Sequence, residues 1–416
     1  MTTGPDRLTP AQLRGLSQPR LTRRNLFRGA GALAGAGALA DLLGACGIQG
    51  TNKSAQAAAA TDWSSWWASK RLNGHFTFDN WAEYIDVTKH GKHPTLEQFT
   101  AKTGIKVAYN DAAVADVATY YGKVSPNLAA GKPIGADLFV MTNGWEFTEL
   151  VQHGWVAQLD HSRMPNFLKY ADATAVSPSY DFDALHSAVW QTGYTGIAYH
   201  SDMIEGDITG WSDLTRPEYH GKVGLLSDLD DLAMASMCVT GAHPEASTED
   251  DWRKAADWLT TKLRPNVTKF YDQGYLDAFK AKQVPIAMAY SGDILAIQSD
   301  FPKAKFVFPR EGFTIWHDNM MIPITARNPL DALRWIDFYY QPSIAATVED
   351  YIWYVSPVTG VRQYIADVLD DTDYSDSPLA FPPPDVLAKA HLYPVMKDRT
   401  EHDLYTSIFQ PVVQGS

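Results

Sequence analysis

Residues 137–154 read DLFVMTNGWEFTELVQHG, and this stretch decides the fold class. Its first five residues form a short, mostly apolar run, which is typical of a strand buried inside a sheet. A helix is expected from about Trp145, and Gly154 is the kind of residue that ends a helix. A buried strand followed at once by a helix is the repeating unit of α/β proteins.

The same alternation of strands and helices extends along the chain in both directions. Further strands are expected at residues 75–78, 105–109, 223–226 and 286–290, and a further helix at residues 331–340. A capping box at residues 95–98 (TLEQ) predicts the start of another helix, and Gly104 predicts its end. We therefore expect an α/β fold with helix-covered sheets. Ligands of such folds bind beyond the carboxyl ends of strands, so the residues directly after strands are candidate site residues.

The residues after these strands, and in two later segments, are mostly aromatic or acidic, and no lysine or arginine is among them. They are Asn80, Trp81, Glu83, Tyr84, Thr142, Asn143, Trp145, Ser227, Asp228, Asp230, Asp231, Tyr290, Ser291, Asp293, Trp316, His317, Asp318, Trp353 and Tyr354. Aromatic faces attract cations, and carboxylates pair with ammonium groups. A cleft with this lining would select an elongated organic cation, with rings around its methylene groups and acids at its amines.

Ordinary structural explanations exist for several of these residues. The acids at 228, 230 and 231 could form a solvated turn, since acids are mostly exposed. They could also hold Mg²⁺ or Ca²⁺, although such loops need more oxygen ligands at regular offsets. Trp81 and Tyr84 could be core aromatics. Cys238 has apolar neighbours and no basic residue to lower its pKa, so we expect a buried small side chain rather than a nucleophile.

The N-terminal segment carries an export pattern. Residues 22–28 (TRRNLFR) contain the pair Arg23 and Arg24, and residues 29–45 form a Gly- and Ala-rich run too short for a stable spanning helix. The run ends in LGAC, which resembles the lipobox of bacterial lipoproteins, with Cys46 as the lipidated residue. We expect a twin-arginine lipoprotein signal over residues 1–45. The glycines of this run lack the preceding strand that a dinucleotide-binding loop requires.

A lipid-anchored tether is expected over residues 46–72, because its first part is rich in Gly, Ser, Asn, Gln and Ala. The whole chain has a net charge of −13, and residues 1–45 contain six arginines and two aspartates, so the rest carries −17. This charge disfavours a nucleic-acid partner, because phosphate binding needs clustered Lys and Arg. It suits a cationic ligand without proving one. The roughly 350 remaining residues exceed one ordinary domain, so two lobes are expected.

With these features in place, the sequence resembles the spermidine/putrescine-binding lipoproteins of bacterial ABC importers, in the type II periplasmic solute-binding protein family. The similarity runs from about Phe76 to the C-terminal region and lies in the order and spacing of short segments. These are NWAEY (80–84), LEQF (96–99), TGIKV (103–107), DL (137–138), WSDL (211–214), PEYHG (217–221), WHD (316–318) and YVSP (354–357). The resemblance implies two α/β lobes joined by crossing hinge strands, with the ligand clamped between them. The division it implies is residues 73–195 and 319–365 for lobe 1, and residues 196–318 and 366–416 for lobe 2.

The resemblance further implies a ligand-binding role for nine residues. They are the aromatic residues Trp81, Tyr84, Tyr290, Trp316 and Tyr354, the acids Asp228, Asp231 and Asp318, and the hydroxyl residue Thr142. In this interpretation Asp228 and Asp231 hold one amine end of the ligand, and Asp318 holds an inner or distal amine.

Some positions depart from the family pattern, and they bear on the identity of the ligand. Gly144 stands where polyamine-binding members often have a tyrosine, for which the adjacent Trp145 could compensate. Tyr290 replaces a larger ring. Further candidates for the site are Glu83, Asp293 and Glu401.

The implied function is capture of spermidine, putrescine or a related organic cation at the outer face of the cytoplasmic membrane, for delivery to the permease of an ABC importer. We expect a monomer that is not an enzyme and needs no cofactor or metal; no His-Glu-x-x-His motif is present. One alternative is a binding protein for another small solute on the same scaffold. Another is an exported glycoside hydrolase, since Asp228 and Asp318 could flank a glycosidic bond. A purely structural surface lipoprotein is a third class, but it would not need a cleft rich in aromatics.

Overall fold

The structure is a computed structural model that describes residues 61–271 and 274–414. The predicted export arginines Arg23 and Arg24 and the predicted lipidation site Cys46 lie outside the described residues. Among the helices of the described part, none combines the length and the apolar character needed to cross a membrane.

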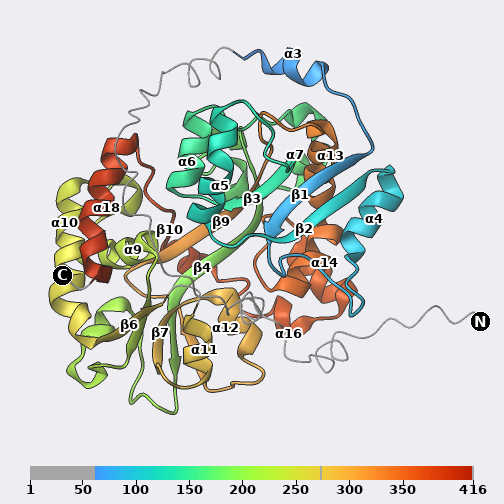
Figure 1. Cartoon of the computed structure of the whole chain (residues 1–416). Helices are drawn as coiled ribbons and strands as arrows, with labels where there is room; N and C mark the ends of the chain where they lie inside the picture. Colours follow the sequence, from blue (N-terminus) through green and yellow to red (C-terminus); the bar gives the residue numbers. More distant parts are fainter. Residues whose placement is uncertain (1–60, 272–273, 415–416) are drawn as a thin grey trace, which may run out of the picture.

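One mixed sheet forms the centre of the molecule (Figure 1). Its main path runs in the order β2-β1-β3-β9-β4-β7-β5-β6, while β8 pairs with β4 and β10 pairs with β9. The strands are β1 (His75–Trp81), β2 (Lys106–Val114), β3 (Leu138–Thr142), β4 (Ala188–His200), β5 (Val223–Leu226), β6 (Val267–Tyr271), β7 (Ile286–Tyr290), β8 (Ala304–Val307), β9 (Phe313–Met321) and β10 (Ala390–His391).

Two long antiparallel strands, β4 and β9, occupy the middle of this sheet. On one side β1, β2 and β3 run parallel to one another, and on the other side β5 runs parallel to β6 and β7. Every residue of β4 is buried, which is expected of a strand covered on both faces. The carboxyl ends of the strands in the two parallel sets therefore face each other across β4 and β9, where the predicted site residues lie.

Helices cover both faces of the sheet (Figure 1). The α-helices of the described residues are α3 (Trp63–Ala68), α4 (Pro94–Thr103), α5 (Val117–Ala129), α6 (Trp145–Gln152), α7 (Pro165–Tyr170), α8 (Ala173–Val176), α9 (Leu229–Thr240), α10 (Glu249–Trp258), α11 (Tyr275–Lys280), α12 (Ser291–Ile297), α13 (Pro329–Tyr339), α14 (Pro342–Ile352), α15 (Val361–Tyr364), α16 (Thr372–Ser375), α17 (Pro384–Leu387) and α18 (Arg399–Gln414). The predicted α/β class is confirmed, and each predicted strand and helix is present to within a few residues.

The predicted capping box is wrong, although the helix that it announced exists. Helix α4 begins at Pro94 with His93 as its N-cap residue, so Thr95 lies inside the first turn. The carboxylate of Asp86 accepts the backbone N–H of Thr95 at 2.9 Å. A distant acid thus satisfies a donor of the first turn that a capping box would satisfy locally. The predicted helix end is confirmed, because Gly104 caps α4 with a φ of +76°.

Aromatic side chains fill much of the core where α13 packs on the sheet. The ring of Trp190 in β4 lies 4.3 Å from that of Tyr339 and 6.2 Å from that of Trp335, both on α13. The ring of Phe78 in β1 lies 6.0 Å from each tryptophan. Each such side chain buries on the order of 150–250 Å², so this packing attaches β1 and the first part of β4 to α13. Cys238 is 8% exposed, which confirms the buried position expected for it.

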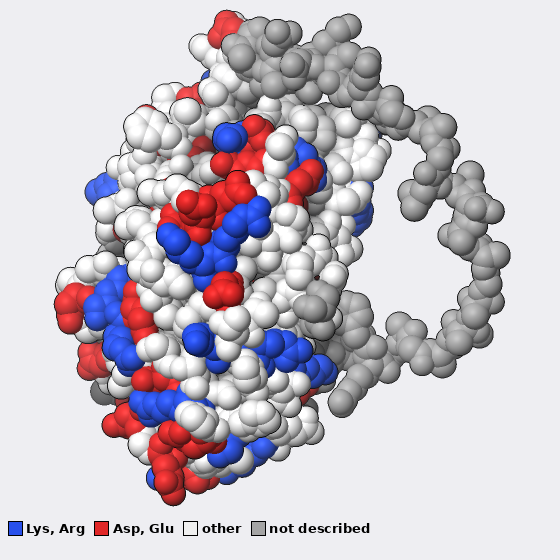
Figure 2. Space-filling model, turned by 90° about the vertical axis from the view of Figure 1, so that its left-hand side faces the viewer, with Lys and Arg blue, Asp and Glu red and all other residues white. Residues whose placement is uncertain are grey.

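Charged side chains of both signs are interspersed on the face shown in Figure 2. The net negative charge of the chain is therefore not gathered into one acidic patch on that face. A concentration of acids lies instead in the pocket described next.

Candidate ligand-binding site

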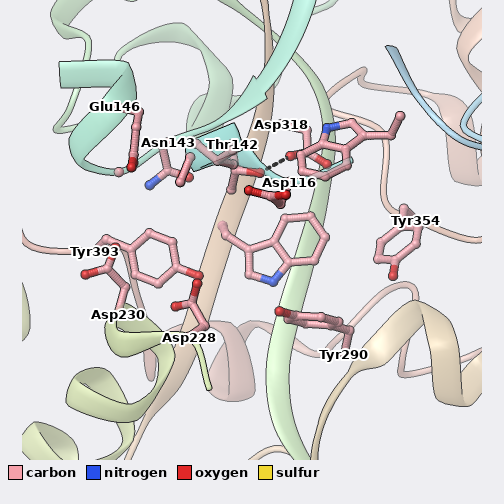
Figure 3. Close-up of a pocket in the computed structure, with 15 residues that line it drawn as sticks. Asp116, Thr142, Asn143, Glu146, Asp228, Asp230, Tyr290, Asp318, Tyr354 and Tyr393 are labelled. Carbon is pink, nitrogen blue, oxygen red and sulfur yellow. Dashed lines mark hydrogen bonds between the residues drawn. The ribbon is translucent and has the colours of Figure 1, made fainter. Parts of the chain in front are cut away.

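A pocket of about 230 Å³ opens where the ends of β1, β3 and β7 meet α9 and β9 (Figure 3). Its lining residues are Trp81, Asp116, Val117, Ala118, Thr142, Asn143, Gly144, Glu146, Asp228, Asp230, Tyr290, Trp316, Asp318, Tyr354 and Tyr393. Seven of the nine residues singled out from the sequence are in this lining; the exceptions are Tyr84 and Asp231. Trp81, Thr142 and Tyr290 end a strand and Asp228 follows one by two residues, as expected for an α/β fold. Trp316 and Asp318 lie within β9, and Tyr354 follows α14.

Asp318, on β9, provides the acid at one side of the pocket. The hydroxyl of Tyr84 donates to its Oδ2 at 2.6 Å, and the hydroxyl of Thr142 donates to its Oδ1 at 2.5 Å. Thr142 ends β3 and is paired with Asp318 across the sheet. Two donors hold the carboxylate in one orientation, with only 3% of the residue exposed. Tyr84 thus lies behind the lining and positions Asp318 there.

Aromatic rings form the middle of the pocket. The Trp316 ring centroid lies 5.7 Å from that of Tyr290, edge to face, and 5.4 Å from that of Tyr354. Trp316 extends over Gly193 of the neighbouring strand β4, where a Cβ atom would come within 2.1 Å of the indole. Gly193 therefore makes room for this ring. Aromatic faces arranged in this way attract the methylene groups and charge of an organic cation.

Asp293 lies behind the rings. It accepts hydrogen bonds from the hydroxyl of Tyr275 at 2.6 Å and from the hydroxyl of Tyr354 at 3.0 Å. Tyr275 in turn accepts the backbone N–H of Tyr290 at 3.0 Å. Asp293 is therefore connected to two of the rings and does not itself line the pocket.

A second group of acids comes from the start of α9 and from α6. Asp228 is the N-cap residue of α9, and its carboxylate accepts the backbone N–H of Asp231 at 3.0 Å. Burial raises the pKa of Asp228, and burial together with the charge of Asp228 raises the pKa of Asp230 well above its usual value. The pKa of Glu146 is also raised, chiefly by burial and further by the charge of Asp228. A cation among these crowded, buried carboxyls would offset both causes that raise their pKa values, so this group is suited to bind an ammonium ion.

Asp231, predicted as the second acid of a pair, lies beneath the lining. It is 1% exposed, and the hydroxyl of Tyr393 donates to it at 3.3 Å. Burial, with the charge of Asp228, raises the pKa of Asp231 to about 8. Successive helical residues point about 100° apart, and in α9 it is Asp230, rather than Asp231, that faces the pocket.

Three charged or polar lining residues were missed from the sequence. Asp116 is the N-cap residue of α5, directly after β2; the strand prediction stopped at residue 109 and so hid its place at a strand end. Glu146 lies in the first turn of α6. Tyr393 follows the two-residue strand β10, which is too short to leave a pattern in the sequence.

The remaining candidates point elsewhere. Trp145 stacks on the ring of His402 at 4.5 Å and is not part of the lining, so it does not compensate for Gly144. Glu401 accepts the backbone N–H of Lys397 at 2.7 Å near the start of α18. Glu83 is exposed, has a φ of +54°, and lies outside the lining.

Comparisons with known proteins identify the family to which the sequence is similar. A sequence model of the family described as "Bacterial extracellular solute-binding protein" matches residues 95–382. The spermidine/putrescine-binding periplasmic protein 1 of Haemophilus influenzae is 27% identical over 312 residues, covering 75% of this chain and 81% of that protein. The putrescine-binding periplasmic protein SpuD of Pseudomonas aeruginosa is 27% identical over 346 residues, covering 79% of this chain and 89% of that protein.

Solved structures show the same fold. The spermidine/putrescine ABC transporter substrate-binding protein PotD of Streptococcus pneumoniae superposes with a TM-score of 0.70 at 20% identity, covering 82% of this chain and 99% of that one. A putative spermidine/putrescine ABC transporter protein of Listeria monocytogenes has a TM-score of 0.68 at 23% identity, covering 83% and 100%. The predicted two-lobe solute-binding fold is therefore confirmed.

Proposed function

This chain belongs to the family of bacterial extracellular solute-binding proteins, and on that premise we propose that it captures a di- or polyamine for the permease of an ABC importer. The named relatives bind spermidine or putrescine, and the pocket has the chemistry that such ligands require. The extracytoplasmic setting follows from the family. That the chain is a binding protein and not an enzyme is also part of the proposal, and it is supported by relatives named for binding alone.

The observation that carries the proposal is the separation of two acidic positions by aromatic rings. Asp318 lies toward one side of the pocket, with Tyr290 below it in this view, and Glu146 and Asp230 lie toward the other side (Figure 3). An alkyl diamine has the same order of groups: a cation, a run of methylenes and a second cation. We propose that Asp318 binds one ammonium group, that Asp228, Asp230 and Glu146 bind the other, and that Trp81, Trp316, Tyr290 and Tyr354 pack on the methylenes.

We propose that the two lobes meet within β4 and β9, at residues 195/196 as the resemblance implies, and at residues 317/318, one residue before the position 318/319 that it implies. The pairing of strands supports this division. From Thr195 onward β4 pairs with β7, while β9 pairs with β3 from Asp318 onward. Two strands shared by both halves form a natural hinge for closure over a ligand.

A third crossing between the lobes is placed at residues 365/366 by the resemblance alone. We propose that it lies later, between Phe381 and Ala390. The hydroxyl of Tyr374 donates to Glu349 of α14 at 3.2 Å, and the ring of Phe381 packs on that of Tyr374. These contacts attach the segment to lobe 1 beyond residue 366, whereas β10 pairs with the start of β9.

We further propose that Cys46 carries a lipid, that export uses the paired arginines, and that the protein acts as a monomer. The support is the order of arginine pair, apolar run and LGAC in residues 22–46. In a bacterium expressing the full chain, the wild type should fractionate with membranes and the Cys46→Ser variant should not. Equal membrane retention of both chains would contradict lipid anchoring.

The proposed function is tested by isothermal titration calorimetry of the chain beyond Cys46 with putrescine and with spermidine. One ligand per chain and a rise in Tm are expected with at least one amine. Butane-1,4-diol, which has the length of putrescine without its charges, is the matched control and should not bind. The polyamine proposal fails if neither amine gives heat or a thermal shift, and the ligand is then another small solute of this family.

A further inference from the structure

A second cluster of potential ligand atoms lies outside the pocket, where the end of α9 meets β10. His243 follows α9, Glu245 belongs to the short helix η6 (Pro244–Ala246), and His391 ends β10. We propose that these three side chains form a binding site for Zn²⁺. The proposal is independent of amine capture, because none of the three residues lines the pocket.

One carboxylate oxygen is the centre of the cluster. Oε2 of Glu245 lies 2.9 Å from Nδ1 of His243 and 3.2 Å from Nδ1 of His391. One ligand atom from each of the three residues lies within 4.8 Å of the other two. The two imidazole rings are 5.0 Å apart at an interplanar angle of 82°. Three ligand atoms this close together can occupy three corners of one coordination shell.

The distances and the donor types fit zinc. In tetrahedral zinc sites with metal–ligand bonds of about 2.0–2.2 Å, neighbouring ligand atoms are roughly 3.4 Å apart. The two nitrogen–oxygen distances are close to that value, and a rotation of the exposed His243 ring would adjust the third edge. Two imidazoles and one carboxylate are a known zinc ligand set. Ca²⁺ and Mg²⁺ prefer shells made of oxygen alone.

The surroundings hold the carboxylate and leave one side open. The other oxygen of Glu245, Oε1, accepts the backbone N–H of Leu392 at 3.0 Å, so the orientation of the ligand oxygen is fixed by a second contact. The side chains of Glu245 and His391 are 25% and 19% exposed, and that of His243 is 68% exposed. A metal ion can enter from the side of His243, and water can complete its shell.

Bound Zn²⁺ would join two segments that are distant in the sequence. Glu245 and His391 are 146 positions apart, and the metal would attach β10 to the end of α9 (Figure 1). Two residues beyond His391, Tyr393 lines the pocket and donates a hydrogen bond to Asp231. The metal would thereby hold β10 in place, and with it the position of Tyr393 in the lining of the amine pocket.

The test is calorimetric titration of ZnCl₂ into tag-free protein in the absence of any amine. The wild type should bind one Zn²⁺ at this cluster, and the His243→Ala/His391→Ala double variant should lose that binding event. His220→Ala is the matched control, because His220 is exposed and outside the cluster. The Asp228→Asn variant distinguishes Zn²⁺ binding at this cluster from Zn²⁺ binding in the acidic pocket. It should still bind one Zn²⁺ at the cluster.

Two further variants guard against a folding defect. Glu245→Gln keeps an oxygen for the N–H of Leu392 but loses the charge, and His243→Ala changes only the most exposed ligand. Each should weaken Zn²⁺ binding at least tenfold while leaving the metal-free Tm within error of the wild type. The proposal is overturned if the double variant binds Zn²⁺ like the wild type, or if the wild type binds none. Neither result bears on amine capture, which is measured separately.

Discussion

Asp318 and Asp228, the two predicted acids that line the pocket, are held in place by different kinds of donor. Side-chain hydroxyls from Tyr84 and Thr142 hold Asp318, whereas a backbone N–H at the start of α9 holds Asp228. Both carboxylates are therefore oriented before a ligand arrives. An oriented charge loses less entropy on binding than a free one, so each acid should contribute strongly to affinity.

Replacing Asp228 with Asn should weaken amine binding while preserving the fold. Asn is as good an N-cap residue as Asp, so α9 should keep its first turn. The amine loses a charged partner in a buried setting, at a cost of about 2–5 kcal/mol, which corresponds to roughly a 30- to 5,000-fold higher Kd. Calorimetry with the preferred amine measures this change. Asp250→Asn, an exposed acid on α10, is the control, and an equal loss in both variants would contradict the assignment.

Replacing Asp231 with Asn should stabilise the ligand-free protein at alkaline pH. The pKa of Asp231 is raised from 3.8 to about 8, so between these values the folded state binds more protons than the unfolded state. Stability from this group therefore falls as pH rises through that range. The gain in the free energy of unfolding of Asp231→Asn should be larger at pH 8 than at pH 5, by about 1 kcal/mol or more.

Urea unfolding of the two proteins at both pH values measures the effect of Asp231→Asn. The hydroxyl of Tyr393 can still donate to the amide oxygen of Asn at this position, so a lost hydrogen bond should not obscure the result. A gain of the same size at pH 5 and pH 8 would show that the charge of Asp231 is not the cause.

Among the elements, the pairing of β4 with β9 determines where the ring of Trp316 lies in the pocket. Gly193 of β4 is the direct partner of Trp316 on β9, and the indole occupies the space above the glycine. The absence of a side chain in one strand thus sets the position of a ring on the next. Neither strand by itself specifies this arrangement.

The Gly193→Ala substitution should displace Trp316 and weaken amine binding. A methyl group at this position would lie 2.1 Å from the indole, so the ring must move. Loss of its contact with the ligand should cost about 1–2 kcal/mol of binding free energy, and overpacking should lower stability by about 1–3 kcal/mol. Tryptophan fluorescence and calorimetry measure the two consequences.

Gly122→Ala is the matched control for the Gly193 substitution. Gly122 lies in α5, and a Cβ atom there would meet no atom within 4 Å. This change should leave Kd unaltered and raise the free energy of unfolding by about 0.5–1 kcal/mol, because alanine favours helices over glycine. An unchanged Kd in Gly193→Ala would show that Trp316 does not contact the ligand.

On the scale of the whole molecule, β4 and β9 connect the two sides of the sheet (Figure 1). The pocket lies beside them and is lined by Trp316 and Asp318 of β9. Acids on opposite sides of that pocket come from opposite sides of the sheet: Asp318 pairs with β3, and Asp228 follows β5. A ligand can contact both acids at once only when the two lobes are close together. It therefore binds the closed arrangement more tightly than the open one and shifts the protein toward the closed arrangement.

Small-angle X-ray scattering should therefore show a smaller radius of gyration with saturating amine than without ligand. The Asp228→Asn variant should show a smaller contraction at the same amine concentration, because fewer of its pockets are occupied. The same radius of gyration with and without bound amine in the wild type would argue against closure.

The sequence by itself determined the α/β class and the position of the candidate site, because both depend on local sequence patterns. Short apolar runs form strands wherever they are buried, and residues that directly follow parallel strands collect at one edge of a sheet. Seven of nine singled-out residues reach the pocket lining. Trp81, Thr142, Asp228 and Tyr290 do so for this reason, whereas Trp316 and Asp318 lie within β9 and Tyr354 follows α14. Their role in binding an amine remains a prediction until the titrations are made.

Only the tertiary structure decided which neighbouring acid faces the pocket and which distant side chains meet. The side-chain direction of Asp230 against Asp231 depends on how α9 packs, and Tyr393 reaches the pocket through the pairing of β10 with β9. His243, Glu245 and His391 have no regular spacing, since residues 146 positions apart become neighbours only when the chain folds. Long-range contacts depend on how whole helices and strands pack, and local sequence patterns do not specify that packing.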